Sequence, residues 1–189
     1  MFPSTKEEIE RFIAMPFTAN AAAKGWFPFT LLGPLEQNPT DDLDFTLRTN
    51  DGRKYLELME IHLRELVKET PSGQFVYQPY LVAEMISERI KAKSKRYQGA
   101  TSCGIILLTY VTHWQFCLAD VVYWLVAYWM REDPPIFERV YDVNFLDETA
   151  FESRCLYPAD KDFSDFIPDK YRGNTTILLN PRGFKLEVR

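Results

Sequence analysis

The chain has 189 residues and a mass of 22.2 kDa, which is enough for one domain with a substantial core, so we expect a single domain over residues 1–189. Its composition, with 46% hydrophobic and 26% charged residues, is ordinary for a soluble globular protein. The net charge of −5 excludes attraction of the whole molecule to nucleic acid, so any such binding requires a local basic patch.

A short helix is the first element that the pattern predicts. Thr5 suits an N-cap and Glu8 follows three residues later, which is the capping-box pattern and predicts a helix over residues 5–14. The next stretch, residues 16–38, mixes glycine and proline with large apolar residues and predicts no particular element.

Two strands joined by a tight turn follow. Residues 41–47 and 55–61 both have the composition of strands, and the Asp-Gly pair at 51–52 is typical of a hairpin turn. Each strand carries an acid where strand residues are usually apolar, Asp44 in the first and Glu57 in the second. The second strand has apolar residues on both faces, which predicts a central strand that is covered on both sides.

Beyond the hairpin, the pattern predicts alternating helices and strands. In chain order these are a helix over 80–97, an apolar strand over 104–111, a core helix over 117–131, a strand over 136–146 and an edge strand over 176–179. This order predicts an α/β domain with a central mixed β-sheet flanked by helices.

The apolar stretch over residues 107–129 approaches the length of a membrane span. His113, Gln115 and Asp120 interrupt it, and a charge within a bilayer is costly. We therefore expect a break from His113 to Gln115 rather than a membrane helix, and no membrane partner.

The acid pair of the hairpin has two explanations. In the first, Asp44 and Glu57 converge on one divalent metal, because carboxylate oxygens are the hard ligands that Mg²⁺ prefers. In the second, Glu57 pairs with Arg48 or Arg53 across the hairpin, and Asp44 belongs to a solvated acidic turn. A buried, unpaired carboxylate costs several kcal/mol, so Glu57 requires one kind of partner or the other.

The acid-bearing hairpin, with a helix before it and a helix and an apolar strand after it, resembles the core of the PD-(D/E)XK nuclease superfamily. The resemblance covers about residues 5–145 and leaves 146–189 as a C-terminal extension. It implies a restriction-endonuclease-like fold in which Asp44 is the motif aspartate and Glu57 the motif glutamate. The sequence departs from the motif two residues later, where Met59 replaces the lysine.

The resemblance also implies an activity, namely metal-dependent hydrolysis of phosphodiester bonds, with DNA as the expected substrate. Asp44, Glu57 and the backbone carbonyl of Leu58 would bind Mg²⁺ or Mn²⁺. Glu10 on the first helix resembles the auxiliary acid that some members of the superfamily use, although acids are expected in the first turns of a helix in any case.

The missing lysine limits this expectation. Because Met59 cannot help to position the attacking water, weak or absent cleavage is expected unless a cation comes from elsewhere. Lys91 and Lys95, on the helix over 80–97, are the candidates for that cation. Lys91 also suits a surface ion pair with Glu88, three residues before it.

The basic end of the same helix is a candidate DNA contact. Arg89, Lys93 and Arg96 would bind backbone phosphates without reading the base sequence. As an alternative, these cations complement the dipole at the C-terminus of the helix.

Cysteine usage and the start of the chain concern its location. Cys103, Cys117 and Cys155 are widely spaced and form no CxxC motif, so free thiols in a reducing cytosol fit better than a disulfide framework or a zinc site. No charged and then apolar leader opens the sequence, so we expect a cytoplasmic protein.

Three hypotheses about function remain open. The first is an active metal-dependent nuclease, which the two strand acids and the basic helix end favour. The second is a non-catalytic protein of nuclease fold that binds or regulates a partner, and it could form a homodimer through an aromatic surface. Met59 and the acidic net charge favour this second hypothesis. The third is an unrelated α/β interaction domain.

Overall fold

The computed structural model describes residues 3, 5–39, 43–62, 66, 68–69, 75–111, 118–145, 151–173 and 177–179. Within these residues the helices are α1 (Lys6–Ala23), α2 (Pro79–Tyr97), α3 (Asp120–Glu132) and the short 3-10 helix η1 (Pro168–Tyr171). The main sheet contains β1 (Glu36–Gln37), β2 (Phe45–Thr49), β3 (Gly52–Glu60), β6 (Ile105–Tyr110), β7 (Arg139–Phe145) and β8 (Phe151–Tyr157). A smaller sheet contains β4 (Lys68–Glu69), β5 (Phe75–Tyr77) and β9 (Ile177–Leu179).

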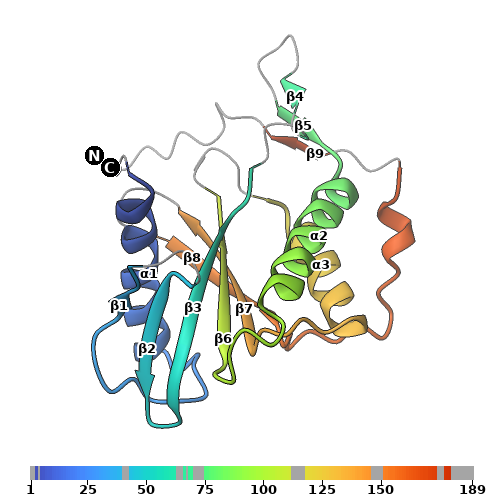
Figure 1. Ribbon diagram of the computed structural model, residues 1–189. Coiled ribbons are helices and arrows are strands. Elements are labelled where there is room, and N and C mark those ends of the chain that lie inside the picture. The colour runs from blue at the N-terminus through green and yellow to red at the C-terminus, as the bar shows by residue number, and fades with distance from the viewer. Residues whose placement is uncertain are drawn as a thin grey trace.

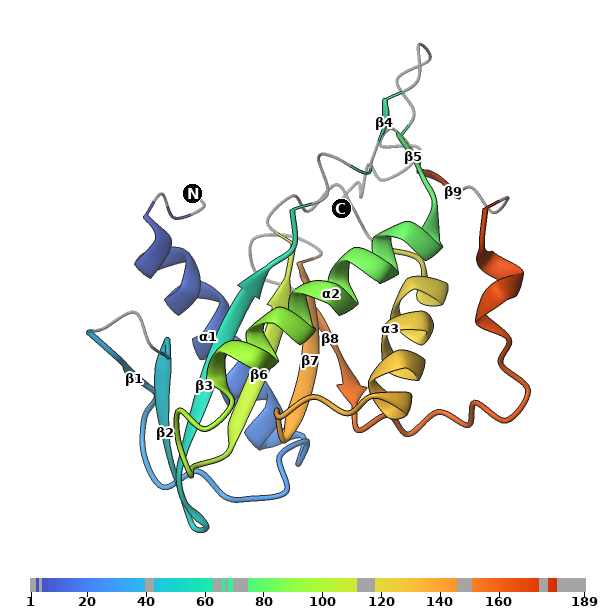
Figure 2. The ribbon, with the colours of Figure 1, turned by 45° about the vertical axis from the view of Figure 1, so that its right-hand side comes forward.

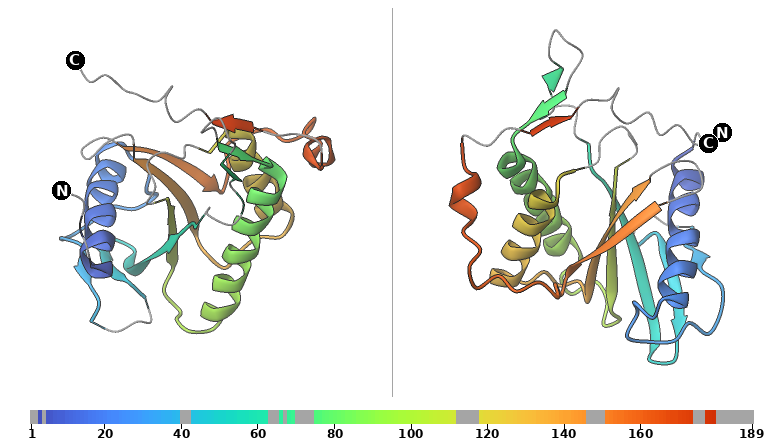
Figure 3. Two further views of the ribbon diagram at one scale, coloured as in Figure 1. Left: turned by 90° about the horizontal axis from the view of Figure 1, so that it is seen from above. Right: turned by 180° about the vertical axis from the view of Figure 1, so that it is seen from behind.

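The main sheet is six-stranded and mixed, with the strand order β1-β2-β3-β6-β7-β8 (Figure 1). β1, β2 and β3 form an antiparallel meander, β3, β6 and β7 are parallel neighbours, and β8 returns antiparallel to β7. Parallel neighbours require crossover connections, which α2 and α3 provide. Figure 2 and Figure 3 show α1 on one face of the sheet and α2 and α3 on the other. The predicted class, a single α/β domain with a mixed sheet flanked by helices, is confirmed.

β3 lies between two apolar cores, one on each face of the sheet. Leu56 and Leu58 pack with Phe17 of α1 on one side of the sheet, whereas Met59 packs with Ile86 of α2 on the other. Successive strand residues point to opposite faces, so Glu57 shares the α2 side with Met59. The prediction of a central strand covered on both sides is therefore confirmed, and it places a carboxylate inside the α2 interface.

The first helix begins as predicted but runs nine residues further than the predicted end at residue 14. Its capping box is present, because the Thr5 side chain accepts from the Glu8 backbone N–H and the Glu8 carboxylate accepts from the Thr5 N–H, both at 3.3 Å. Pro16 lies inside the helix and removes one helical hydrogen bond. Phe17 and Ala21 continue the buried face beyond Pro16, and their packing against the sheet outweighs that loss.

The hairpin and the elements after it lie close to their predicted positions. β2 and β3 are antiparallel and joined at the predicted Asp-Gly turn, where Gly52 has a φ of +104° that suits glycine. The predicted helices and strands at 80–97, 104–111, 117–131 and 136–146 correspond to α2, β6, α3 and β7. The expected break from His113 to Gln115 falls outside the described residues. No helix in the described part of the chain has the length and hydrophobicity needed to cross a bilayer.

The C-terminal part of the chain differs most from expectation. β8 was not predicted, yet it pairs with β7 along its length and extends the main sheet past residue 145. The strand predicted at 176–179 is present as β9, but it pairs with β5 in the smaller sheet rather than at an edge of the main one. Between them, Phe163 and Phe166 pack against α3, with ring centroids 5.9 and 5.6 Å from that of Tyr128.

Candidate active site

The two acids of the hairpin lie next to each other. Phe45 of β2 is paired with Leu56 of β3, which places Asp44, just before β2, opposite Glu57. One Asp44 oxygen accepts a hydrogen bond of 2.6 Å from the backbone N–H of Leu58. One Glu57 oxygen accepts from the backbone N–H of Asp44 at 3.3 Å. The structure therefore brings together the pair that the sequence suggested as metal ligands.

Glu57 is compensated by side chains from α2. The Glu57 residue is only 3% exposed, so its charge requires partners. Lys93 donates to Glu57 Oε1 and to the backbone carbonyl of Leu58, the latter at 3.0 Å. Tyr97, one turn further along α2, donates its hydroxyl to Glu57 Oε1 at 2.8 Å. A lysine ammonium thus contacts Glu57, although the residue two positions after it on β3 is Met59.

The alternative prediction, that Glu57 pairs with Arg48 or Arg53, was wrong. Arg48 pairs instead with Glu36 of β1 at 2.7 Å. Arg53 lies opposite Arg48 near the turn of the hairpin, several residues from Glu57 along β3. Both arginines line a hollow at that end of the sheet, away from the acid pair. A cation from a distant helix, rather than one from the hairpin itself, balances the buried carboxylate.

The proximity of the acids changes the protonation of Asp44. Burial, and then the negative charge of Glu57, raise the pKa of Asp44 to about 7, while the hydrogen bond from Leu58 and the charge of Lys93 act in the opposite direction. Burial and the Glu57 contact also raise the pKa of Tyr97, so its hydroxyl remains a donor. A cation near Asp44 would oppose this rise in its pKa, as the charge of Lys93 does.

Glu10 joins the site from α1. It lines a cleft of about 310 Å³ together with Asp44, and its side chain is only 8% exposed. Burial is the main cause of its raised pKa, the Lys6 ammonium at 3.4 Å lowers it, and the charge of Glu57 contributes to the rise. The predicted auxiliary acid therefore lies on the same cleft as one member of the acid pair.

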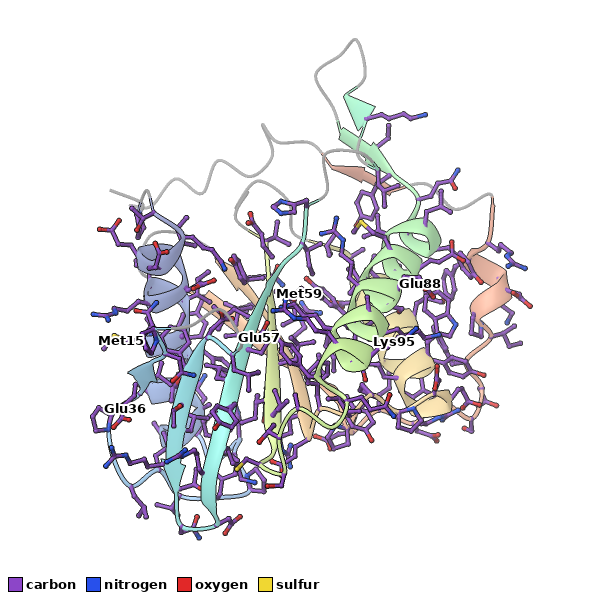
Figure 4. The ribbon with its side chains drawn as sticks, viewed as in Figure 1. Met15, Glu36, Glu57, Met59, Glu88 and Lys95 are labelled. Carbon is purple, nitrogen blue, oxygen red and sulfur yellow. The ribbon has the colours of Figure 1, made fainter. Side chains whose placement is uncertain are left out.

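The other predicted cations of α2 lie elsewhere. Lys91 pairs with Glu88 at 3.9 Å, as its alternative explanation predicted, and with Asp133 at 3.3 Å. Lys95 shares with Lys91 a separate hollow of about 340 Å³ between α2 and the start of the loop after α3. Figure 4 shows Glu88 and Lys95 along α2, apart from Glu57 on β3.

The predicted DNA contacts on α2 have different surroundings. Arg89 donates to the backbone carbonyl of Glu60 at 3.3 Å, and the Arg96 guanidinium lies 5.2 Å from the centre of the Tyr97 ring. Lys93, predicted as a third contact, is the cation on Glu57. Whether Arg89 and Arg96 bind DNA stays a prediction.

The sequence contains a signal for the role of Lys93, although Lys91 and Lys95 were the cations predicted for the site. Ile86 and Ile90 mark the sheet-facing side of α2, and Lys93 and Tyr97 continue it at spacings of three and four residues. Lysine on the buried face of a helix needs a buried acid, and Glu57 was the available one. Lys91 and Lys95 are two positions away, which turns them about 200° around the helix.

The donors fit a hard divalent cation. Asp44 and Glu57 supply carboxylate oxygens. Glu57 Oε1 and the Leu58 carbonyl oxygen both accept from the Lys93 ammonium, so these two oxygens already bind one positive charge. No three His, Cys, Asp or Glu side chains within the described residues converge in a metal-binding group. Mg²⁺ needs no such group, because it is commonly held by one or two carboxylates with water and substrate oxygens.

Comparison with known proteins identifies no relative. No family model, curated protein or solved structure matches this chain. The fold and the arrangement of Asp44, Glu57, Glu10 and Lys93 are therefore the evidence on function.

Proposed function

We propose that the chain is a metal-dependent nuclease of the PD-(D/E)XK type, which hydrolyses phosphodiester bonds in DNA with Mg²⁺ or Mn²⁺. The observation that carries this proposal is the contact between Lys93 and Glu57, next to Asp44. It supplies, from a helix, the cation that Met59 lacks. The order α1, β1–β3, α2, β6, with β3 parallel to β6, supports the same assignment.

The ion would be held by Asp44, Glu57 and the Leu58 carbonyl. These are hard oxygen donors, as Mg²⁺ and Mn²⁺ prefer. When bound, the ion would polarise the scissile phosphate and lower the pKa of a water molecule. Glu57 Oε1 and the Leu58 carbonyl now contact the Lys93 ammonium. The ammonium would therefore share or give up these contacts and stay beside the reacting phosphate.

The side chains of the chain have separate tasks in this proposal. Lys93 offsets the negative charge that develops on the phosphate oxygens and helps to orient the attacking water. Tyr97 fixes one oxygen of Glu57, so that the carboxylate does not rotate away. Glu10, which lines the same cleft as Asp44, would accept a hydrogen bond from water there.

A second candidate is a non-catalytic binding or regulatory protein of the same fold. The same Lys93 contact favours it, because the ammonium already compensates Glu57 within the chain. A buried ion pair with additional hydrogen bonds can persist as a purely structural element. The two candidates differ in whether the acid pair binds a divalent ion.

Plasmid cleavage and calorimetry separate the two candidates. With Mg²⁺ or Mn²⁺, we expect the wild type to nick or linearise supercoiled plasmid and Lys93→Gln to be slower by about a hundredfold, the scale of losing one charge-stabilising group. Lys95→Gln removes the same charge from the same helix outside the site and should keep the wild-type rate. Mn²⁺ binding should be seen in the wild type and lost in Asp44→Asn.

The opposite pattern would favour the second candidate. If the wild type neither cleaves DNA nor binds Mn²⁺, the Lys93–Glu57 pair is structural. If it cleaves and Lys93→Gln cleaves equally well, the role given to Lys93 is wrong.

A further inference from the structure

Arg11 of α1 is held in one orientation by a neutral partner. Its Nε and Nη2 groups both donate to the side-chain oxygen of Gln37 on β1, at 3.2 and 3.0 Å. Gln37 is fixed in turn, because its own amide nitrogen donates to the backbone carbonyl of Glu7 at 3.3 Å. Two of the five N–H groups of the guanidinium are thus used to set its direction. Among the described residues, the other N–H groups, including both on Nη1, have no hydrogen-bond acceptor.

The positive charge of Arg11 is not cancelled by this contact. An amide oxygen orients a guanidinium without supplying a negative charge, and no carboxylate forms an ion pair with Arg11 within the described residues. The basic residues nearby differ, since Lys6 pairs with Glu10 and Arg48 pairs with Glu36. Arg11 is therefore a pre-oriented cation on this side of the sheet.

The location of Arg11 makes this charge useful. It lines the cleft of about 310 Å³ that also contains three acids, Glu7, Glu10 and Asp44, and one further cation, Lys6, which is paired with Glu10. A nucleic-acid strand that enters such an acidic cleft is repelled unless cations bind its phosphates. Arginine suits that task, because its planar N–H groups match phosphate oxygens in pairs.

We propose that Arg11, held by Gln37, is a binding site for a backbone phosphate of the DNA strand next to the phosphate that is cleaved. This inference rests on the proposed nuclease function and adds to it the way in which the substrate is held. It moves the main phosphate contact from the basic end of α2 to the first turns of α1. Gln37 is a positioning residue in this arrangement.

The test measures binding of a fluorescein-labelled DNA duplex by anisotropy in EDTA, over a range of salt concentrations. We expect Arg11→Gln to weaken binding about tenfold. The plot of log K against log salt has a negative slope, and the magnitude of this slope should fall by about one, the value for one lost phosphate contact. Gln37→Glu keeps a partner for Arg11 but adds a compensating charge, so it should weaken binding similarly. Arg48→Gln is the matched control, since it removes an equal charge from an arginine that is already paired, and it should keep the wild-type slope.

The outcomes are separate from those of the metal site. Loss of affinity in Arg11→Gln and Gln37→Glu, with Mn²⁺ affinity unchanged by calorimetry, supports the proposal. Equal affinity and salt slope in the wild type and Arg11→Gln, in a variant whose circular dichroism is native, overturns it. If metal binding and cleavage are absent but the Arg11 dependence is found, the phosphate site stands and the nuclease function fails.

Discussion

Lys93 and Met59 both lie beside Glu57, in the interface between α2 and β3. Met59 follows Glu57 on the same face of β3 and is buried in the α2 interface, with 5% of its surface exposed. Lys93 reaches Glu57 from α2 instead. Because both side chains enter one interface, the charge can in principle reside at either position.

This relation predicts the result of exchanging the two residues. Lys93→Met should lose plasmid cleavage, and adding Met59→Lys should recover a substantial part of it, because the cation returns to the side of Glu57. Met59→Lys alone should not raise the wild-type rate, since a second ammonium would be placed near the first and its burial would be unfavourable. Initial cleavage rates of the four proteins with Mg²⁺ give the answer. A double variant as inactive as Lys93→Met, although folded, would contradict the exchange.

Among the elements, the turn before β6 depends on a glycine. A Cβ at Gly104 would lie 2.2 Å from atoms of the Glu138 carboxylate. That carboxylate accepts two hydrogen bonds of 2.8 Å from Lys54, whose side chain is 11% exposed. The absence of a side chain at residue 104 thus allows an ion pair to form between β3 and the residue before β7.

Gly104→Ala should therefore destabilise the fold by about 1–2 kcal/mol, because Glu138 must move and leave the Lys54 ammonium less well paired. Urea unfolding measures this change. Gly33→Ala is the control, since a Cβ there meets nothing within 4 Å. In a Glu138→Ala background the cost at residue 104 should largely disappear, and an unchanged cost would show that the ion pair is not its source.

A buried carboxyl between β6, β7 and α3 makes the stability of the fold depend on pH. Asp142 is fully buried and accepts from the Thr109 hydroxyl at 2.7 Å and from the Asn144 amide at 3.1 Å. Burial raises the pKa of Asp142 to about 6, while the hydrogen bonds from Thr109 and Tyr123 and the charge of Arg154 lower it. The folded protein therefore holds this proton over a pH range in which the unfolded chain has released it.

The stability contributed by this proton is present at low pH and is lost as the pH rises from about 4 to about 6. Over that window the folded state binds more protons than the unfolded state, and a shift of about two pKa units corresponds to roughly 2–3 kcal/mol. Urea unfolding of the wild type and of Asp142→Asn across this window isolates the effect. The difference between the two unfolding free energies should change with pH inside the window and be constant above it. A difference that is constant across the window would mean that burial does not raise the pKa of Asp142 in the folded state.

For the whole molecule, features set by neighbouring residues were predictable. The capping box at Thr5, the Asp-Gly turn and the apolar runs of α2 and β6 are local patterns, and all were found. The closeness of Asp44 and Glu57 followed from one hairpin register. Features that depend on distant packing were not predictable in this way. α1 continues past Pro16 because its buried face packs against the sheet, and β8 is held at the edge of the main sheet by its pairing with β7.

The role of Lys93 also depends on distant packing. To predict it, one must know both which face of α2 packs on the sheet and that Glu57 is buried. With only one of these facts, a lysine on a helix is expected at the surface. The position of β9 against β5 rather than the main sheet is a similar case, since strand pairing between distant segments has no local pattern.

The ammonium on Glu57 also gives this buried carboxylate a counter-ion from the chain itself. A carboxylate whose counter-ion is covalently attached to the same chain needs no dissolved cation when the core closes. In Lys93→Met, Glu57 would need a counter-ion from the solution. The thermal midpoint of this variant should therefore rise steeply with added Mn²⁺, whereas that of the wild type should rise much less. Under the proposed function, such a chain would be fully folded before any metal ion is bound.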